Sequence, residues 1–145
     1  MNEIVEPFAE FVGQFELSEP KIPILSTVTG KWMTAEQATD PNYWADHLRA
    51  PVRFSEAVTE MWGEDPSRIL IELGPRKTLA ILSKQHAEDP KNKISIPTLS
   101  DNAENNAEWH SMMSAVAQLW LAGAEIQWCR TVSYTHLTLP TIYSV

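Results

Sequence analysis

The stretch from Arg68 to Leu82, RILIELGPRKTLAIL, decides the fold of this chain. Its first half is apolar and β-branched, which is typical of a buried strand, and its second half has the pattern of a helix. Gly74 and Pro75 stand between the two halves and predict a tight turn. The stretch therefore predicts a strand, a turn and a helix, which is the repeating unit of an α/β sheet.

The turn in this stretch has two interpretations, a phosphate-binding loop or a structural turn. A phosphate loop has the pattern G-x-x-x-x-G-K-[ST], but Ile71 and Arg76 stand where its glycines belong. Pro75 also lacks an N–H group that could bind a phosphate. We therefore favour a structural turn, in which Gly74 lets the backbone leave the strand and Pro75 sets φ. Since α/β proteins bind ligands at the carboxyl edge of the sheet, Gly74 and Pro75 are expected to border a site.

The composition of the 145 residues narrows the functional classes. A net charge of −8 with eleven scattered Lys and Arg residues argues against nucleic acid as a partner. One cysteine and four histidines give no zinc-ligand spacing, so we expect no metal site. No long apolar segment or leader is present, which predicts a cytoplasmic protein without membrane contact.

The rest of the chain alternates between helical and strand patterns. Asp40 and Pro41 are expected to begin a short helix, which Pro51 breaks. The pattern predicts a parallel or mixed sheet with helices packed on it. The expected helices are 2–15, the segment after Asp40, the segment with Phe54, Ala57, Val58, Met61 and Trp62 on one face, 77–86, and 108–122 with an apolar stripe of Trp109, Met112, Met113, Val116, Leu119 and Trp120; the expected strands are 22–30, 68–73 and 94–99.

The candidate catalysts in the sequence are weak. No G-x-S-x-G elbow is present, which argues against a serine nucleophile paired with His47 or His86; the serines considered are Ser26, Ser55 and Ser83. His47 is interpreted as a packing residue beside Trp44. The tryptophans on helix stripes are interpreted as core or interface anchors rather than base-stacking platforms.

The last fifteen residues, 131–145, differ from the rest. They contain no charged side chain, whereas residues 1–130 carry all thirty. The stretch from Val132 to Thr141 resembles a translated sequencing-adapter read-through, so we expect residues 131–145 not to be native. The alternative is a native polar β-strand, because threonine alternates there with tyrosine and leucine.

Several motifs together carry a family resemblance. They are P-x-x-S-x-x-T-G at 23–30, D-P-x-Y-W-x-x-H-L-R-x-P-V-R-F at 40–54, E-x-G-P at 72–75 and L-W-x-x-G-x-x-x-x-W at 119–128. Their order and spacing over residues 1–130 resemble the C-terminal part of an acyltransferase domain of modular (type I) polyketide synthases. This family commonly has G-P-G where the chain has Gly74-Pro75-Arg76. The resemblance implies an incomplete α/β-hydrolase-like large subdomain at 1–99 and a post-acyltransferase linker with a helix at 100–130.

The resemblance also implies a function. Family members transfer a malonyl-type unit from coenzyme A through an acyl-serine to the phosphopantetheine thiol of an acyl carrier protein. The family's Ser elbow, carboxylate-binding Arg and catalytic His are expected to be absent here, so the chain is expected to retain no catalytic residue, to bind no cofactor and to be inactive alone. Arg53 matches a position that approaches the catalytic His, mainly through its main chain. Its alternative is a surface arginine at a helix start.

Two functional classes follow. The first is an acyltransferase fragment, whose partners would be the acyl carrier protein and ketosynthase domains of the same synthase. The second is a non-catalytic docking module that uses the tryptophan-rich segment from Glu108 to Trp128. We expect the first to aggregate alone and the second to fold as a monomer, because an incomplete sheet leaves apolar faces uncovered.

Overall fold

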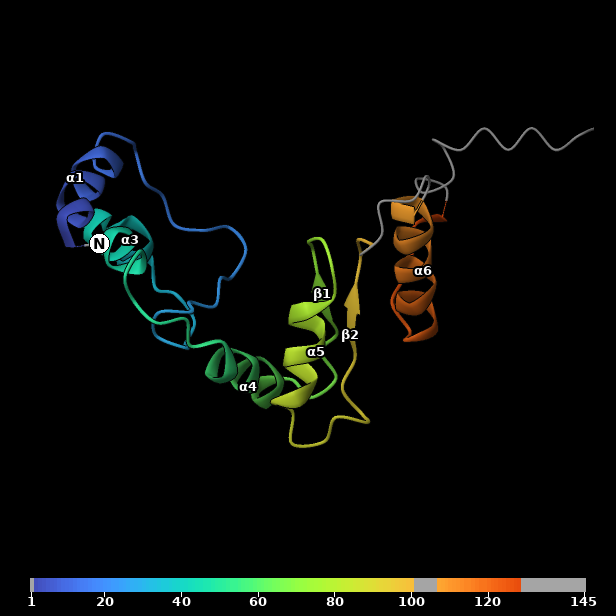
Figure 1. Ribbon diagram of the computed structural model, residues 1–145. Coiled ribbons are helices and arrows are strands. Elements are labelled where there is room, and N and C mark those ends of the chain that lie inside the picture. The colour runs from blue at the N-terminus through green and yellow to red at the C-terminus, as the bar shows by residue number, and fades with distance from the viewer. Residues whose placement is uncertain (1, 101–106, 129–145) are drawn as a thin grey trace, which may run out of the picture. The chain divides into compact units, whose positions relative to one another are not determined.

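A computed structural model describes residues 2–100 and 107–128 (Figure 1). The predictions made for residues 101–106 and 129–145 fall outside this part. The chain divides into two compact units, which are described separately below. The first unit contains Met1–Leu70 and Thr78–Ser95, and the second contains Ile71–Lys77 and Ile96–Val145.

Three helices occupy the amino-terminal half of the first unit. Helix α1 spans Asn2–Val12 and packs against helix α3, which spans Pro41–His47 (Figure 1). The predicted cap of α3 is confirmed, because the Asp40 carboxylate accepts a hydrogen bond of 2.9 Å from the Asn42 N–H. Both helices end a few residues earlier than the sequence predicted.

Helix α2, which spans Ala35–Thr39, was not predicted from the sequence. It begins with a capping box in which the Thr34 hydroxyl accepts from the Gln37 N–H at 3.2 Å, and the Gln37 side chain accepts from the Thr34 N–H at 3.1 Å. The Trp44 indole of α3 donates to the Ala38 carbonyl at 2.9 Å and holds the end of this short helix.

The strand predicted for residues 22–30 is wrong. This segment contributes a single antiparallel bridge, between Leu25 and Trp32, and Ile22 is 78% exposed. The cause lies at Ser26, whose hydroxyl accepts from the Val28 N–H at 3.1 Å and whose carbonyl accepts from the Gly30 N–H at 2.8 Å. A serine that bonds to the backbone that follows it competes with a strand and favours a turn.

The strand, turn and helix predicted from Arg68 to Leu82 are present in shortened form. They follow helix α4 (Phe54–Glu64) as strand β1 (Leu70–Glu72), a turn, and helix α5 (Thr78–Gln85), and strand β2 (Ser95–Pro97) comes after them. The Leu70 N–H donates to the Ile94 carbonyl at 3.0 Å, and the Thr98 N–H to the Glu72 carbonyl at 3.2 Å. Both strands therefore advance in the same direction, and their pairing is parallel. This agrees with the parallel or mixed sheet that the sequence predicted.

The first unit has a core built on the apolar face of α4. Ala57, Val58 and Trp62 are buried on this face, as the spacing predicted. The Trp62 indole donates to the Arg68 carbonyl at 2.9 Å, which ties the helix to the chain that enters β1. Ser83 of α5 is buried as well.

The second unit contains helix α6, which spans Ala107–Leu121. Its buried residue is Ala115, whereas Trp109 is 48% and Trp120 is 57% exposed. The rings of Trp120 and Trp128 meet edge to face with their centroids 6.1 Å apart. The tryptophan stripe is therefore largely open to solvent in this unit. Among the described residues, no helix is both long and apolar enough to cross a membrane.

Candidate functional site at the start of helix α4

A tight turn from Ser26 to Gly30 forms the first part of the candidate site. Ser26 is 2% exposed, and its hydroxyl accepts from the Val28 N–H at 3.1 Å and from the Thr29 N–H at 3.4 Å. The same hydroxyl makes a short hydrogen bond with the Tyr43 hydroxyl of α3. Because Ser26 is bonded on both sides, it serves as the anchor of the turn and not as a free nucleophile.

Arg53 joins the start of α4 to this turn through its main chain. Its N–H donates to the Thr27 carbonyl at 2.8 Å. Its own carbonyl accepts the first hydrogen bond of the helix, from Ala57, at 3.1 Å. Its backbone angles, φ −86° and ψ 55°, lie outside the helical region, so Arg53 is the N-cap residue of α4.

The Arg53 side chain also contacts the turn. The guanidinium donates from Nη1 to the Thr29 carbonyl at 3.2 Å and from Nη2 to Glu56 Oε1 at 3.0 Å, and its Nε forms a close ion pair with Glu56 Oε2. Both side chains are about half exposed, so solvent screens the pair and it adds little to stability. These contacts instead position the first turn of α4 against the turn that ends at Gly30.

Two histidines lie in the first unit. His47 Nε2 is 3.5 Å from Thr27 Oγ1, and its ring stacks on Trp44 with centroids 6.3 Å apart. This placement agrees with the packing role expected for His47. His86 Nδ1 is 3.0 Å from the Ser55 hydroxyl, at the second residue of α4.

The sequence argues against the Ser55–His86 pair as a catalyst. A nucleophilic serine needs a base that is itself held by a third group, together with hydrogen-bond donors for the oxyanion. Within residues 2–100 and 107–128, no carboxylate is hydrogen-bonded to the His86 ring, and Phe54 meets that ring edge to face at 6.4 Å. Both residues are exposed, so the pair links α4 to the end of α5.

The turn at 74–76, in the second unit, differs from the expected one. Gly74 is not in the left-handed region and has open space where a Cβ would lie. Arg76 is the residue with positive φ, at 73°. The glycine freedom expected at Gly74 is therefore needed at Arg76, where the related family commonly has the second glycine of G-P-G. Arg53 lies in the first unit, whereas Gly74 and Pro75 lie in the second.

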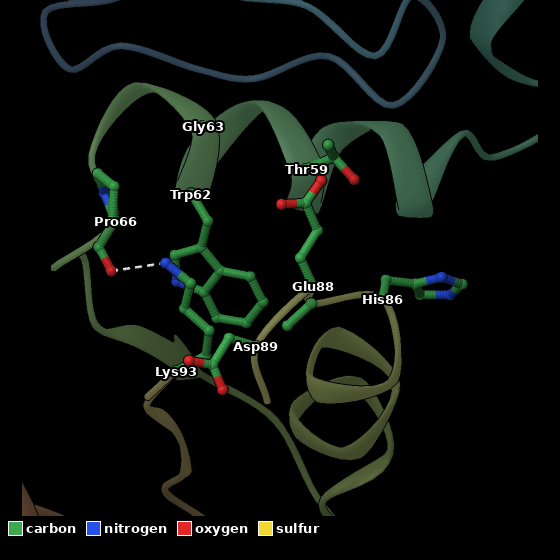
Figure 2. A pocket seen from close by; sticks show the side chains of 9 residues that line it. Thr59, Trp62, Gly63, Pro66, His86, Glu88, Asp89 and Lys93 are labelled. Atoms are coloured by element: carbon green, nitrogen blue, oxygen red, sulfur yellow. Dashed lines mark hydrogen bonds between the residues drawn. The ribbon is translucent and has the colours of Figure 1, made fainter. Parts of the chain in front are cut away.

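A pocket of about 340 Å³ opens beside the carboxyl half of α4. Figure 2 shows the Lys93 side chain along the Trp62 indole, with its Nζ bonded to the Pro66 carbonyl. The Nζ atom is 5.6 Å from the ring centroid and 2.7 Å from the carbonyl oxygen. The lysine charge is thus already engaged, and the pocket offers a mainly apolar wall. No cluster of three metal-ligating side chains exists among the residues that the structure describes.

No protein-family model matches the chain. Among curated proteins, it is 29% identical over 128 residues to a phenolphthiocerol/phthiocerol polyketide synthase from Mycobacterium tuberculosis, and the match covers 88% of this chain and 8% of the relative. It is 30% identical over 128 residues to naringenin synthase of Pestalotiopsis fici, and this match covers 88% of this chain and 4% of the relative.

Solved structures give the same relationship. The acyltransferase domain of ZmaA matches with a TM-score of 0.82 and 30% identity, over 92% of this chain and 30% of that domain. The acyltransferase domain of SpnD, in complex with 2-(pent-4-yn-1-yl)malonyl, matches with a TM-score of 0.75 and 33% identity, over 84% and 29% of the two chains.

The fold and the sequence together therefore define an α/β chain of the acyltransferase class. More specifically, the chain belongs to the acyltransferase domains of polyketide synthases, which are transferases. It spans about a third of the solved domains and less than a tenth of these curated relatives.

Sequence reasoning identified Arg53 but missed Glu56, which binds its side chain, and Gly30, which lies against Glu56. The spacing of Arg53 and Glu56, three residues apart at a helix start, was a readable signal for an ion pair. The contact with Gly30 had no such signal, because it joins segments that are far apart in the sequence.

Proposed function

We propose that this chain is the C-terminal part of an acyltransferase that moves a malonyl-type unit from coenzyme A to an acyl carrier protein. The unit passes through an acyl-serine that lies outside this chain. In this proposal residues 1–99 belong to the acyltransferase domain and residues 100–130 to the linker that follows it. The partners are the carrier and ketosynthase domains of a cytoplasmic synthase.

The observation that carries the proposal is the main chain of Arg53. A carbonyl oxygen has two lone pairs, and the Arg53 carbonyl gives one to the Ala57 N–H. The other can accept a hydrogen bond from the ring N–H of a histidine supplied by the rest of the domain. Such a bond fixes the tautomer and orientation of a general base, as acyl transfer through a serine requires. In this proposal Arg53 borders the site without performing chemistry. The same role stays a prediction for Gly74 and Pro75, which belong to the second unit.

The test uses a chimera in which this chain replaces the matching segment of the ZmaA acyltransferase domain. We expect the purified chain to form no acyl-enzyme with malonyl-CoA, and the chimera to form one that is visible by intact-protein mass spectrometry. Acylation of the chain alone would overturn the expected inactivity. A folded chimera that never acylates would overturn the proposed function.

A second function is favoured by the exposed tryptophans of the second unit. Trp109, Trp120 and Trp128 are each 45% exposed or more, which suits a protein-docking surface. A docking module predicts a monomer with one cooperative thermal transition. An acyltransferase fragment predicts aggregation in size-exclusion chromatography.

A further inference from the structure

Glu56 occupies an unusual place between the N-cap of α4 and the turn. On one side its carboxylate binds the Arg53 guanidinium. On the other side the Glu56 side chain lies against Gly30, where an added Cβ would be 2.9 Å from Glu56 Cβ and 2.8 Å from its Oε2. Gly30 also has φ at +69°, a conformation that side chains other than glycine's disfavour. The first turn of α4 therefore sits directly on the backbone of Gly30.

This arrangement replaces the usual helix cap. An N-cap Ser, Thr or Asp would bond to the backbone of the first turn, but Arg53 makes no side-chain cap bond. Glu56 is the third residue of α4, where a glutamate often accepts from the N-cap N–H. Here the Arg53 N–H donates to the Thr27 carbonyl, and the Glu56 carboxylate accepts from the Arg53 guanidinium instead.

As a consequence, both the main-chain N–H and the side chain of Arg53 are hydrogen-bonded. Its N–H is bound to Thr27, and its guanidinium to Thr29 and Glu56. The carbonyl accepts from the Ala57 N–H and keeps its second lone pair for a partner, and its direction depends on the ψ of 55° that these contacts hold. The first turn of a helix also carries positive potential, which favours the Glu56 carboxylate at this position.

We infer that Glu56, seated on Gly30, is a positioning residue that sets the direction of the Arg53 carbonyl. This inference rests on the proposed function, because the direction matters for catalysis only if that carbonyl orients a histidine base. Glu56 itself touches neither substrate nor the reacting atoms.

The test compares Glu56→Ala with Glu60→Ala. Glu60 lies one turn further along α4 and pairs with Lys31 at 2.6 Å, so its removal deletes a similar ion pair without touching Arg53. Since misplacing a catalytic group lowers the rate of the chemical step, we expect Glu56→Ala to lower the kcat of the chimera about tenfold with KM little changed. Glu60→Ala should leave both constants unchanged, and Glu56→Gln, which keeps an acceptor for Nη2, should recover part of the rate.

Amide hydrogen exchange gives a second readout, in the 145-residue chain and in the chimera. We expect the Arg53 N–H to exchange about tenfold faster in Glu56→Ala and in Gly30→Ala, and at the wild-type rate in Glu60→Ala. Unchanged Arg53 exchange in Glu56→Ala would overturn the inference. A chimera without acyl transfer would overturn the proposed function, while the exchange result would still decide whether Glu56 positions Arg53.

Discussion

The hydroxyl oxygens of Ser83 and Ser95 lie 3.0 Å apart and join α5 to β2 inside the first unit. Ser83 is 2% and Ser95 8% exposed, and Ser83 Oγ also lies 3.0 Å from the Ala80 carbonyl. The helix therefore packs on the strand through a pair of small polar groups that satisfy each other. A larger side chain at either position would separate the two elements.

The serine pair can be tested by a double-mutant cycle in the chimera. Because Ser83→Ala leaves a buried hydroxyl without its Ser83 partner, we expect it to lower the free energy of unfolding by about 1–2 kcal/mol. Ser83→Ala combined with Ser95→Ala should cost less than the sum of the single changes. Urea unfolding measures all three variants, with the exposed neighbour Lys84→Ala as a control. Strictly additive costs would show that the two hydroxyls do not interact.

Replacing Arg76 with glycine is expected to stabilise the protein. A residue other than glycine loses about 1–2 kcal/mol of stability at the φ of 73° that Arg76 adopts. Glycine avoids this cost, although its greater freedom in the unfolded chain offsets part of the gain. Arg76→Gly should therefore raise the melting temperature of the chimera, and Arg76→Val should lower it. Gly74→Ala is the matched control, since it meets open space and should have little effect. A lower melting temperature in Arg76→Gly would contradict the left-handed turn.

The carboxyl group of Asp65 should titrate at low pH. The Ser67 hydroxyl at 2.6 Å, and then the Ser67 N–H at 2.9 Å, stabilise the carboxylate and lower the pKa of Asp65 below its ordinary value. A pKa lowered in the folded state stabilises the fold above the unfolded pKa, and this contribution is lost as pH falls through the folded pKa. Ser67→Ala should raise the pKa of Asp65, and Ser67→Thr should not. NMR titration of the Asp65 carboxyl carbon tests this, and equal values in all three proteins would refute it.

The indole N–H of Trp62 provides a fourth test. Trp62 is 5% exposed, so Trp62→Phe removes its bond to the Arg68 carbonyl within the core, and we expect a loss of about 1–3 kcal/mol in the free energy of unfolding. Trp120→Phe makes the same chemical change on a side chain that is 57% exposed, and it should cost less than about 0.5 kcal/mol. Denaturant unfolding of the chimera compares the two. Equal losses would mean that the buried hydrogen bond contributes nothing measurable to the free energy of unfolding.

The sequence predicted the elements whose patterns are local. The apolar spacing of Phe54 to Trp62 predicted α4, and Asp40 with Pro41 predicted the start of α3. The parallel pairing of β1 and β2 followed from the strand, turn and helix order. These signals are local because each depends on the propensity and spacing of neighbouring residues.

The failures come from competition that a hydrophobic pattern does not reveal. Ile22 to Gly30 is β-branched, but the Ser26 carbonyl and hydroxyl close a turn and leave one bridge. The left-handed residue of the 74–76 turn was expected at Gly74 and is found at Arg76. At the candidate site, Arg53 was identified by resemblance, whereas the contact of its partner Glu56 with Gly30 depends on tertiary structure. The interpretation of residues 131–145 as read-through stays a prediction.

The attachment of α4 to the turn has a consequence for how such chains can vary in length. The bond between Arg53 and the Thr29 carbonyl closes a loop between residues 24 positions apart, which contains α2 and α3. The entropy of closing a flexible loop grows slowly, by about 0.6 kcal/mol for each doubling of its length. Added residues in the exposed stretch after α3 would therefore change the closure cost little, whereas Asp40 ends α2 and caps α3 and leaves no room for them. Length changes between Leu48 and Val52 should therefore leave the bond between Arg53 and the Thr29 carbonyl in place.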